Sequence, residues 1–150
     1  MGTIKGKIKA ISISKQQGTS KYNVPKAELE IGLGIVGDAH AGNWHRQVSL
    51  LAEESIQKLR AKGVQVTSGS FAENITTEGI NLQKLTIGSK LRLGPIVEIE
   101  ITQLGKNCHS ACRIFQQIGD CIMPREGIFA KVIKSGQIKI GDTIEILTIK

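Results

Sequence analysis

The chain has few aromatic residues, few prolines and no long apolar run. The scarcity of aromatic residues and the lack of an apolar run each argue against one class of function. Aromatic residues make up 3% of the 150 residues. They are scattered and form no pairs: Tyr22, Trp44, Phe71, Phe115 and Phe129. The chain therefore lacks the aromatic platform on which many proteins stack bases, which argues against a nucleic-acid partner. No apolar run approaches the roughly 20 residues that span a bilayer, so we expect a soluble protein with no membrane segment.

Cysteine is also rare, and its number is odd. With 3 cysteines, a disulfide would leave one thiol over. The N-terminal stretch MGTIKGKIKAISIS alternates lysine with isoleucine and has no continuous apolar leader. Free thiols in a reducing cytoplasm are the resulting expectation. No linker or low-complexity tract divides the sequence, so we expect residues 1–150 to form one domain.

Negative charge is in deficit. Lys and Arg number 20 against 13 Asp and Glu, a formal net charge of +7. Such a surface attracts anions, of which nucleic acids and phosphorylated small molecules are both examples. Lys5, Lys7 and Lys9 alternate with apolar or small residues, a pattern typical of the solvated face of a strand rather than of a binding patch.

Alternation of apolar and polar residues predicts a mainly β protein. Strand patterns occupy residues 3–13, 26–31, 47–50, 71–75, 97–102 and 128–133. Two similar segments, 85–94 and 138–147, each read as a turn followed by an alternating strand. Residues 52–62 are predicted to be a helix, because glutamates come first, lysine and arginine come late, and Gly63 follows. Residues 81–85 suggest a single helical turn, and residues 109–118 a second helix. A closed or partly closed β-barrel with one or two short helices is the economical way to protect so many short strand edges.

All three cysteines lie in one basic segment, Gly105 to Gly127. Cys108, Cys112 and Cys121 with His109 offer four soft ligands, but structural zinc sites usually contain two closely spaced ligand pairs and this segment has one. For Cys112 and Cys121 we favour the role of small buried apolar residues. Cys108 differs, because it follows a strand and precedes a predicted helix, where a thiolate can be exposed to helix amides. Its residue pattern alone leaves a reactive and a buried structural thiol equally open.

A glycine-rich loop contains a second group of candidate functional residues. Gly37-Asp38-Ala39-His40, followed by Arg46, can bind an anion through bare backbone amides and a guanidinium. The plainer alternative is that Asp38 caps a turn and His40 is an ordinary hydrogen-bonded histidine. The loop matches neither the Walker nor the dinucleotide-binding pattern. Asn74, next to Glu73 in a short extended piece, carries little information alone.

Taken in order, these motifs resemble the MOSC domain family, named after the C-terminal part of molybdenum cofactor sulfurase. The matching stretches are GIVGDAHAG (residues 34–42) with RQVSL (46–50), SFAENI (70–75), LTIGSKLRLG (85–94), Gln103 leading to Cys108, and GIFAKV (127–132) with Gly141-Asp142. The resemblance implies a β-barrel of the pyruvate-kinase insert type and one functional cysteine, whose position Cys108 fits. Related proteins often have proline before that cysteine, where this chain has Asn107.

The resemblance also implies a function connected with the molybdenum cofactor (molybdopterin), a pterin dithiolene with a phosphate. Cys108 would carry sulfur as a persulfide or bind molybdenum directly. His40, Arg46, Asn74 and Lys106 would line the anionic site. Expected partners are a cysteine desulfurase or other sulfur donor, and molybdenum cofactor biosynthesis proteins or molybdoenzymes. The alternatives are a non-catalytic molybdopterin-binding or chaperone module and, with less support, a nucleic-acid-binding barrel.

Overall fold

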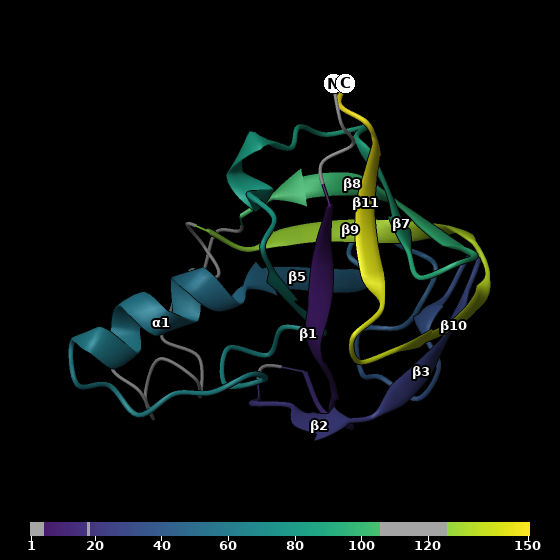
Figure 1. Ribbon diagram of the computed structural model, residues 1–150. Coiled ribbons are helices and arrows are strands. Elements are labelled where there is room, and N and C mark those ends of the chain that lie inside the picture. Colours follow the sequence, from purple (N-terminus) through teal and green to yellow (C-terminus); the bar gives the residue numbers. More distant parts are fainter. Residues whose placement is uncertain (1–4, 18, 106–125) are drawn as a thin grey trace.

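The described residues of the computed structural model, 5–17, 19–105 and 126–150, form a closed seven-stranded β-barrel with one α-helix (Figure 1). The strands follow one another around the barrel in the order β11, β7, β8, β9, β5, β6 and β1, and β1 pairs with β11 to close it. Their bounds are β1 Lys5–Ile13, β5 Val48–Ala52, β6 Ile75–Glu78, β7 Lys90–Leu93, β8 Val97–Leu104, β9 Ile128–Lys134 and β11 Thr143–Thr148. The predicted mainly β barrel is confirmed.

Period-two alternation explains why these segments are strands. Along β8, Val97, Ile99 and Ile101 are fully buried in the barrel core, while Glu98 and Glu100 are partly exposed outside. The outward charges are matched across the strands, since Glu100 lies opposite Lys90 on one side and Lys131 on the other. The outer wall at these strands is therefore mixed in charge and not uniformly basic.

Helix α1 (Glu53–Ala61) connects two parallel strands. It follows β5 directly, and β5 and β6 form the parallel pair of the barrel. The helix packs a second apolar cluster against the outside of the barrel, with the members Leu51, Ile56, Leu59, Val66, Phe71, Ala72 and Phe129. The helix predicted at residues 52–62 is confirmed, one residue shorter at each end. In Figure 1, α1 projects to one side of the barrel.

The extended piece predicted at residues 71–75 is wrong for most of its length. Strand β6 begins only at Ile75, and Ala72 has a left-handed backbone with φ of 65°. The cause is Glu73, whose carboxylate accepts hydrogen bonds from the amides of Gly69 (2.7 Å) and Phe71 (3.2 Å) and so holds a turn. A buried carboxylate that caps backbone amides overrides the local strand pattern.

A smaller sheet and short elements complete the fold. Strands β10 (Gly136–Lys139), β3 (Lys26–Glu30) and β4 (Gly34–Ile35) pair beside the barrel, and β2 (Tyr22–Val24) pairs with β1. The helical turn predicted at residues 81–85 is the 3₁₀ turn η1 (Leu82–Lys84). Residues 109–118, predicted as a second helix, lie outside the described residues. Within the described ranges, no helix has the length and apolar character needed to cross a membrane.

Candidate functional site

A buried ion pair holds the base of the loop that follows β4. Nζ of Lys21 lies 2.7 Å from Oδ1 of Asp38, and both side chains are fully buried. The amide of Ser14 donates to Oδ1 of Asp38, and the amide of His40 donates to Oδ2. Burial opposes the charge on this carboxyl group, but the hydrogen bond and positive charge of Lys21 and the two backbone amides hold the pKa of Asp38 below its ordinary value of 3.8.

The imidazole of His40 is fixed from two directions. Its Nδ1 lies 3.1 Å from Nζ of Lys21. Its ring stacks on the indole of Trp44, with an interplanar angle of 3° and ring centroids 6.4 Å apart. The indole Nε1 donates to the carbonyl oxygen of His40 at 2.8 Å, which ties the two residues together. The side chain of His40 is 20% exposed, whereas that of Lys21, which contacts its Nδ1, is fully buried. A buried lysine therefore holds a ring that reaches the surface.

Arg46 contacts the same indole as His40 does. Its guanidinium carbon lies 4.7 Å from the ring centroid of Trp44 and 5.6 Å from that of Phe129. Contacts of this length are typical of cation–π attraction. The Nε atom of Arg46 is buried and has no hydrogen-bond partner in the described part of the chain. A buried donor without an acceptor is costly, and a guanidinium matches the geometry of oxyanions, so this side chain is suited to an anionic ligand.

The loop is attached to the barrel where β8 ends. Nε2 of His45 lies 2.9 Å from Oε1 of Gln103, and Nε2 of Gln103 donates to the carbonyl oxygen of Gly105 at 2.8 Å. The hydroxyl of Thr102 donates to the carbonyl oxygen of His45. Gln103 also faces Phe129 across the β8–β9 ladder. The 37–46 loop and the residues leading to Cys108 therefore meet on the outer side of the barrel.

Both ends of the cysteine-bearing segment are anchored at this place. The amide of Gly105 donates to the carbonyl oxygen of Gly127 at 2.7 Å, one step beyond the pairing of Leu104 with Ile128. Lys106, Cys108, Cys112 and Cys121 lie outside the described residues. In the sequence, Cys108 follows Gly105 by three residues, a length of chain that reaches at most about 11 Å.

Asn74 lies apart from the loop and is fully buried between strands. Its Oδ1 accepts from the amide of Ser49 at 2.9 Å, and its Nδ2 donates to the carbonyl oxygen of Ser12 at 3.1 Å. The amide thus links β5 to β1. Of the four binding residues predicted from the sequence, His40 and Arg46 contact the same indole and Asn74 is buried in the barrel wall. Lys106 lies outside the described residues.

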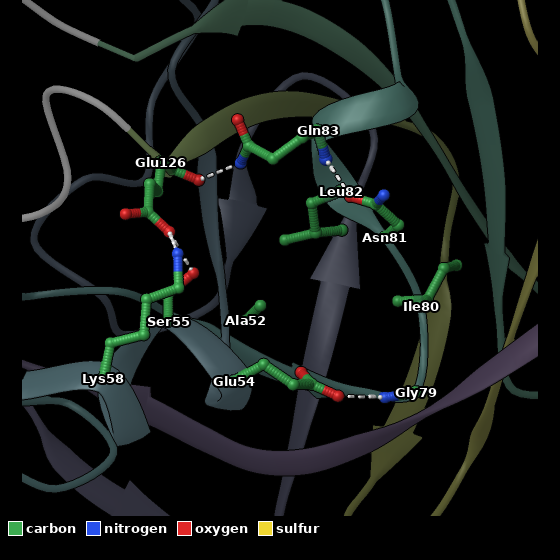
Figure 2. Close-up of a pocket in the computed structure, with 10 residues that line it drawn as sticks. All are labelled: Ala52, Glu54, Ser55, Lys58, Gly79, Ile80, Asn81, Leu82, Gln83 and Glu126. Carbon is green, nitrogen blue, oxygen red and sulfur yellow. Dashed lines mark hydrogen bonds and ion pairs between the residues drawn. The ribbon is translucent and has the colours of Figure 1, made fainter. Parts of the chain in front are cut away.

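Glu126, the first described residue after the segment, is held by α1 and η1 (Figure 2). Its Oε1 accepts from Oγ of Ser55 at 2.6 Å and from Nζ of Lys58 at 3.0 Å, and its backbone oxygen accepts from the side-chain Nε2 of Gln83. These residues line a cleft of about 460 Å³, which also contains Ile80 and Leu82. These polar contacts fix Glu126, two residues before β9 begins.

A second cleft is bordered by residues of the 37–46 loop. It has a volume of about 520 Å³ and is bordered by Trp44, His45 and Lys131, with Ile31 and Ile133 among its apolar residues. Trp44 therefore borders this cleft and also contacts the guanidinium of Arg46. Among the described ranges, no group of three or more histidine, cysteine, aspartate and glutamate side chains is placed to hold a metal ion.

Sequence reasoning missed five residues of the site. Lys21, Trp44, His45, Gln103 and Phe129 all contact the loop or position it. The one available indication was that Trp44 is the single tryptophan and lies between His40 and Arg46. For Lys21 the sequence offers no indication, because its partner Asp38 is 17 positions away.

Comparison with known proteins identifies the family of this chain and solved structures with a similar fold. The family model of the MOSC domain matches residues 37–145. A search of curated proteins found no match to the chain. Among solved structures, the YuaD protein from Bacillus subtilis is similar, with a TM-score of 0.77, 20% identity and 96% of each chain covered. YiiM from Geobacillus stearothermophilus has a TM-score of 0.71 and 17% identity over 95% of this chain and 75% of its own. YiiM from Escherichia coli has a TM-score of 0.68 and 17% identity over 95% and 70%.

Proposed function

Because the chain belongs to the MOSC domain family, we propose that it takes part in molybdenum cofactor maturation or sulfur transfer, with Cys108 as its reactive thiol. The 37–46 loop binds the anionic part of the cofactor through Arg46 and His40. We place this activity in the cytoplasm, where thiols stay reduced.

The observation that carries the proposal is the position of Arg46. Its guanidinium contacts the rings of both Trp44 and Phe129, and its buried Nε lacks an acceptor within the described ranges. Phe129 faces Gln103, which contacts Gly105, three residues before Cys108. An anion-binding group close to Gly105, from which the chain continues toward Cys108, would suit a ligand with both a phosphate and sulfur atoms.

The residues present fit such a ligand. A guanidinium forms paired hydrogen bonds with phosphate oxygens, and the contacts with Trp44 and Phe129 hold that of Arg46 in place. Arg46 and His40 would hold the phosphate, and Lys106 would add a second positive charge. The bound cofactor supplies a dithiolene and a molybdenum centre, and the chain's own residues bind and orient it.

Sulfur transfer by Cys108 requires no external oxidant. The Cys108 thiolate attacks the terminal sulfur of a donor persulfide, and a new sulfur–sulfur bond forms as the donor's own sulfur–sulfur bond breaks. The donor leaves as a thiolate, and Cys108 becomes a persulfide. A cysteine desulfurase is the class of enzyme that generates such a donor. Acceptors would be cofactor biosynthesis proteins or molybdoenzymes. In the alternative chemistry, the same thiolate is a soft ligand for molybdenum.

A non-catalytic cofactor-binding or chaperone role is the second candidate. In the described part of the chain, the aromatic contacts of Arg46 are made by Trp44 and Phe129, and neither depends on a cysteine. Binding by these groups alone would survive loss of the thiol. A nucleic-acid-binding role has less support, because Lys90 and Lys131 flank Glu100 on the barrel wall and do not form a continuous basic strip.

Two measurements test the proposal. The protein is purified from cells that make the cofactor, and molybdenum and fluorescent pterin oxidation products are measured for the native chain and for Cys108→Ala. The purified apoprotein is also incubated with a cysteine desulfurase and cysteine, and persulfide is located by mass spectrometry. We expect persulfide on Cys108 in the native chain and its loss in Cys108→Ala, but not in Cys112→Ala or Cys121→Ala.

The outcomes separate the candidates. Persulfide found equally on Cys108→Ala would exclude the carrier role. Stoichiometric pterin that survives Cys108→Ala, without persulfide on the native chain, would favour the chaperone role. Absence of both pterin and persulfide would reject a connection with the cofactor.

A further inference from the structure

We propose that Lys21 is a positioning residue that fixes His40 as its Nε2–H tautomer, so that His40 serves the site as a hydrogen-bond donor to an oxyanion. The inference deepens the proposed function and rests on it for the identity of the oxyanion. The assignment of the tautomer itself rests only on the geometry around Lys21.

The ammonium of Lys21 has three hydrogen atoms and three acceptors. Nζ lies 2.7 Å from Oδ1 of Asp38, 3.1 Å from Oγ of Ser14 and 3.1 Å from Nδ1 of His40. An ammonium group can only donate. Nδ1 of His40 must therefore be the acceptor of its hydrogen bond with Lys21. In a neutral imidazole the proton then resides on Nε2.

The charge on Lys21 is required by its neighbour. Asp38 is fully buried and within 2.7 Å of Nζ, and two backbone amides also donate to its carboxylate. A carboxylate arranged in this way is held in its charged form. A neutral lysine would leave that charge buried without a counterion, which is strongly unfavourable. Burial lowers the pKa of Lys21 below its ordinary value of 10.5, and the hydrogen bond and negative charge of Asp38 oppose that shift. The buried carboxylate thus favours the charged form of Lys21, which supplies a fixed donor to His40.

The ring cannot make a half-turn without losing its contact with Lys21, because Cδ2 would then take the place of Nδ1. It is stacked parallel to Trp44, whose indole nitrogen is bonded to the carbonyl oxygen of His40. The amide of His40 is held by Oδ2 of Asp38 at 3.0 Å. Backbone, ring face and Nδ1 are thus each fixed by a different group.

This arrangement defines the chemistry that His40 can offer. Nε2 carries a proton and donates, so it suits phosphate or another oxyanion. The same atom is a poor metal ligand, because ligation needs an unprotonated nitrogen. The structure therefore assigns His40 to the anion-binding part of the site and not to metal coordination.

The test is a measurement of the tautomer by long-range ¹H–¹⁵N correlation NMR on ligand-free protein labelled at histidine, at mildly alkaline pH. The resonances of His40 are identified by their absence in His40→Gln. We expect an unprotonated Nδ1 and a protonated Nε2, with well-separated shifts. In Lys21→Met the two shifts should move toward each other, as both tautomers become populated. Protonated Nδ1 in the native chain, or unchanged shifts in the variant, would overturn the proposal.

Two further variants keep the result interpretable. Lys21→Met leaves Asp38 buried without its counterion and can fail to fold, so Lys21→Met with Asp38→Asn removes both charges, and it should show the same convergence of the shifts. Lys15→Met, at an exposed lysine near the loop, should leave the His40 spectrum unchanged. Because the protein is free of ligand, this result is independent of the pterin and persulfide experiments. Their failure rejects the proposed function alone, and a wrong tautomer rejects the role of Lys21 alone.

Discussion

The guanidinium of Arg46 lies over the indole of Trp44, with 4.7 Å between the guanidinium carbon and the ring centroid. The indole also stacks on the ring of His40. One aromatic side chain therefore positions two of the four residues that the sequence predicts for the anion site.

We predict that Arg46→Lys lowers cofactor retention without unfolding the protein. Lysine keeps the positive charge, but it loses the planar fork and the stacking on Trp44. Loss of one charge-assisted hydrogen bond corresponds to roughly tenfold weaker binding. Fluorescent pterin per mole of purified protein measures the effect. Arg92→Lys is the matched control, because Arg92 pairs with Glu145 on the barrel wall. Equal pterin content in Arg46→Lys and the native chain would contradict this role.

Breaking the buried ion pair should strongly destabilise the protein. Lys21→Met leaves the carboxylate of Asp38 buried without its counterion, for which we expect a loss of about 3–5 kcal/mol in the free energy of unfolding. Lys21→Met with Asp38→Asn should recover part of this loss, because no unpaired charge remains. Urea denaturation measures both. The exposed Lys15→Met should change stability by less than about 0.5 kcal/mol, and a similar small change in Lys21→Met would show that the pair contributes little.

The pH dependence of stability should reveal Asp38. Because the pKa of Asp38 is held below 3.8 in the folded state, its carboxylate binds protons more weakly there than in the unfolded chain. The stabilisation is complete above the unfolded pKa and is lost as the pH falls below 3.8 through the folded pKa. Denaturation at a series of acidic pH values should therefore show a shallower decline for Asp38→Asn than for the native chain. Parallel profiles would exclude this contribution.

The local sequence pattern predicted much of the fold, but it did not predict much of the site. Strand β8 was predictable because its apolar and acidic residues alternate, and α1 because its end charges match the helix dipole. The same reasoning failed at Glu73. Its carboxylate accepts hydrogen bonds from the amides of Gly69 and Phe71, and these contacts exist only in the folded turn.

The same limit applies to the site residues. His40 and Arg46 were identifiable because glycines and cationic side chains occur together in one loop. Lys21 and Gln103 lie far from that loop in the sequence and reach it only when the barrel closes. A buried lysine also contradicts the usual expectation that lysine is exposed.

Asn74→Ala should damage the barrel rather than the anion site. The substitution leaves the amide of Ser49 and the carbonyl oxygen of Ser12 without their side-chain partner. We expect a loss of about 2–4 kcal/mol in the free energy of unfolding, from two disrupted buried hydrogen bonds. Pterin content per mole of folded protein should stay unchanged. Asn43→Ala, at an exposed loop position, is the control. A selective loss of pterin with full stability would instead restore Asn74 to the binding site.

Two glycines that share a left-handed backbone should respond differently to alanine. At Gly69 (φ of 93°) an added Cβ would lie 2.4 Å from the carbonyl oxygen of Lys21, whereas at Gly32 (φ of 79°) nothing lies within 4 Å. Gly32→Ala should therefore cost only the backbone strain of about 1–2 kcal/mol. Gly69→Ala must also displace the main chain of Lys21, so we expect a larger loss of stability.

The consequence for the site distinguishes Gly69→Ala from a general packing defect. Gly69 accepts a hydrogen bond from the amide of Lys21 at 2.8 Å, so a shift there moves Nζ away from Nδ1 of His40. Where the variant folds, its His40 nitrogen shifts should converge as in Lys21→Met, while Gly32→Ala should keep the native spectrum. Urea denaturation and the histidine NMR spectrum of the two variants measure both effects. Equal stabilities and equal spectra would mean that the close approach of Gly69 to Lys21 does not position the loop.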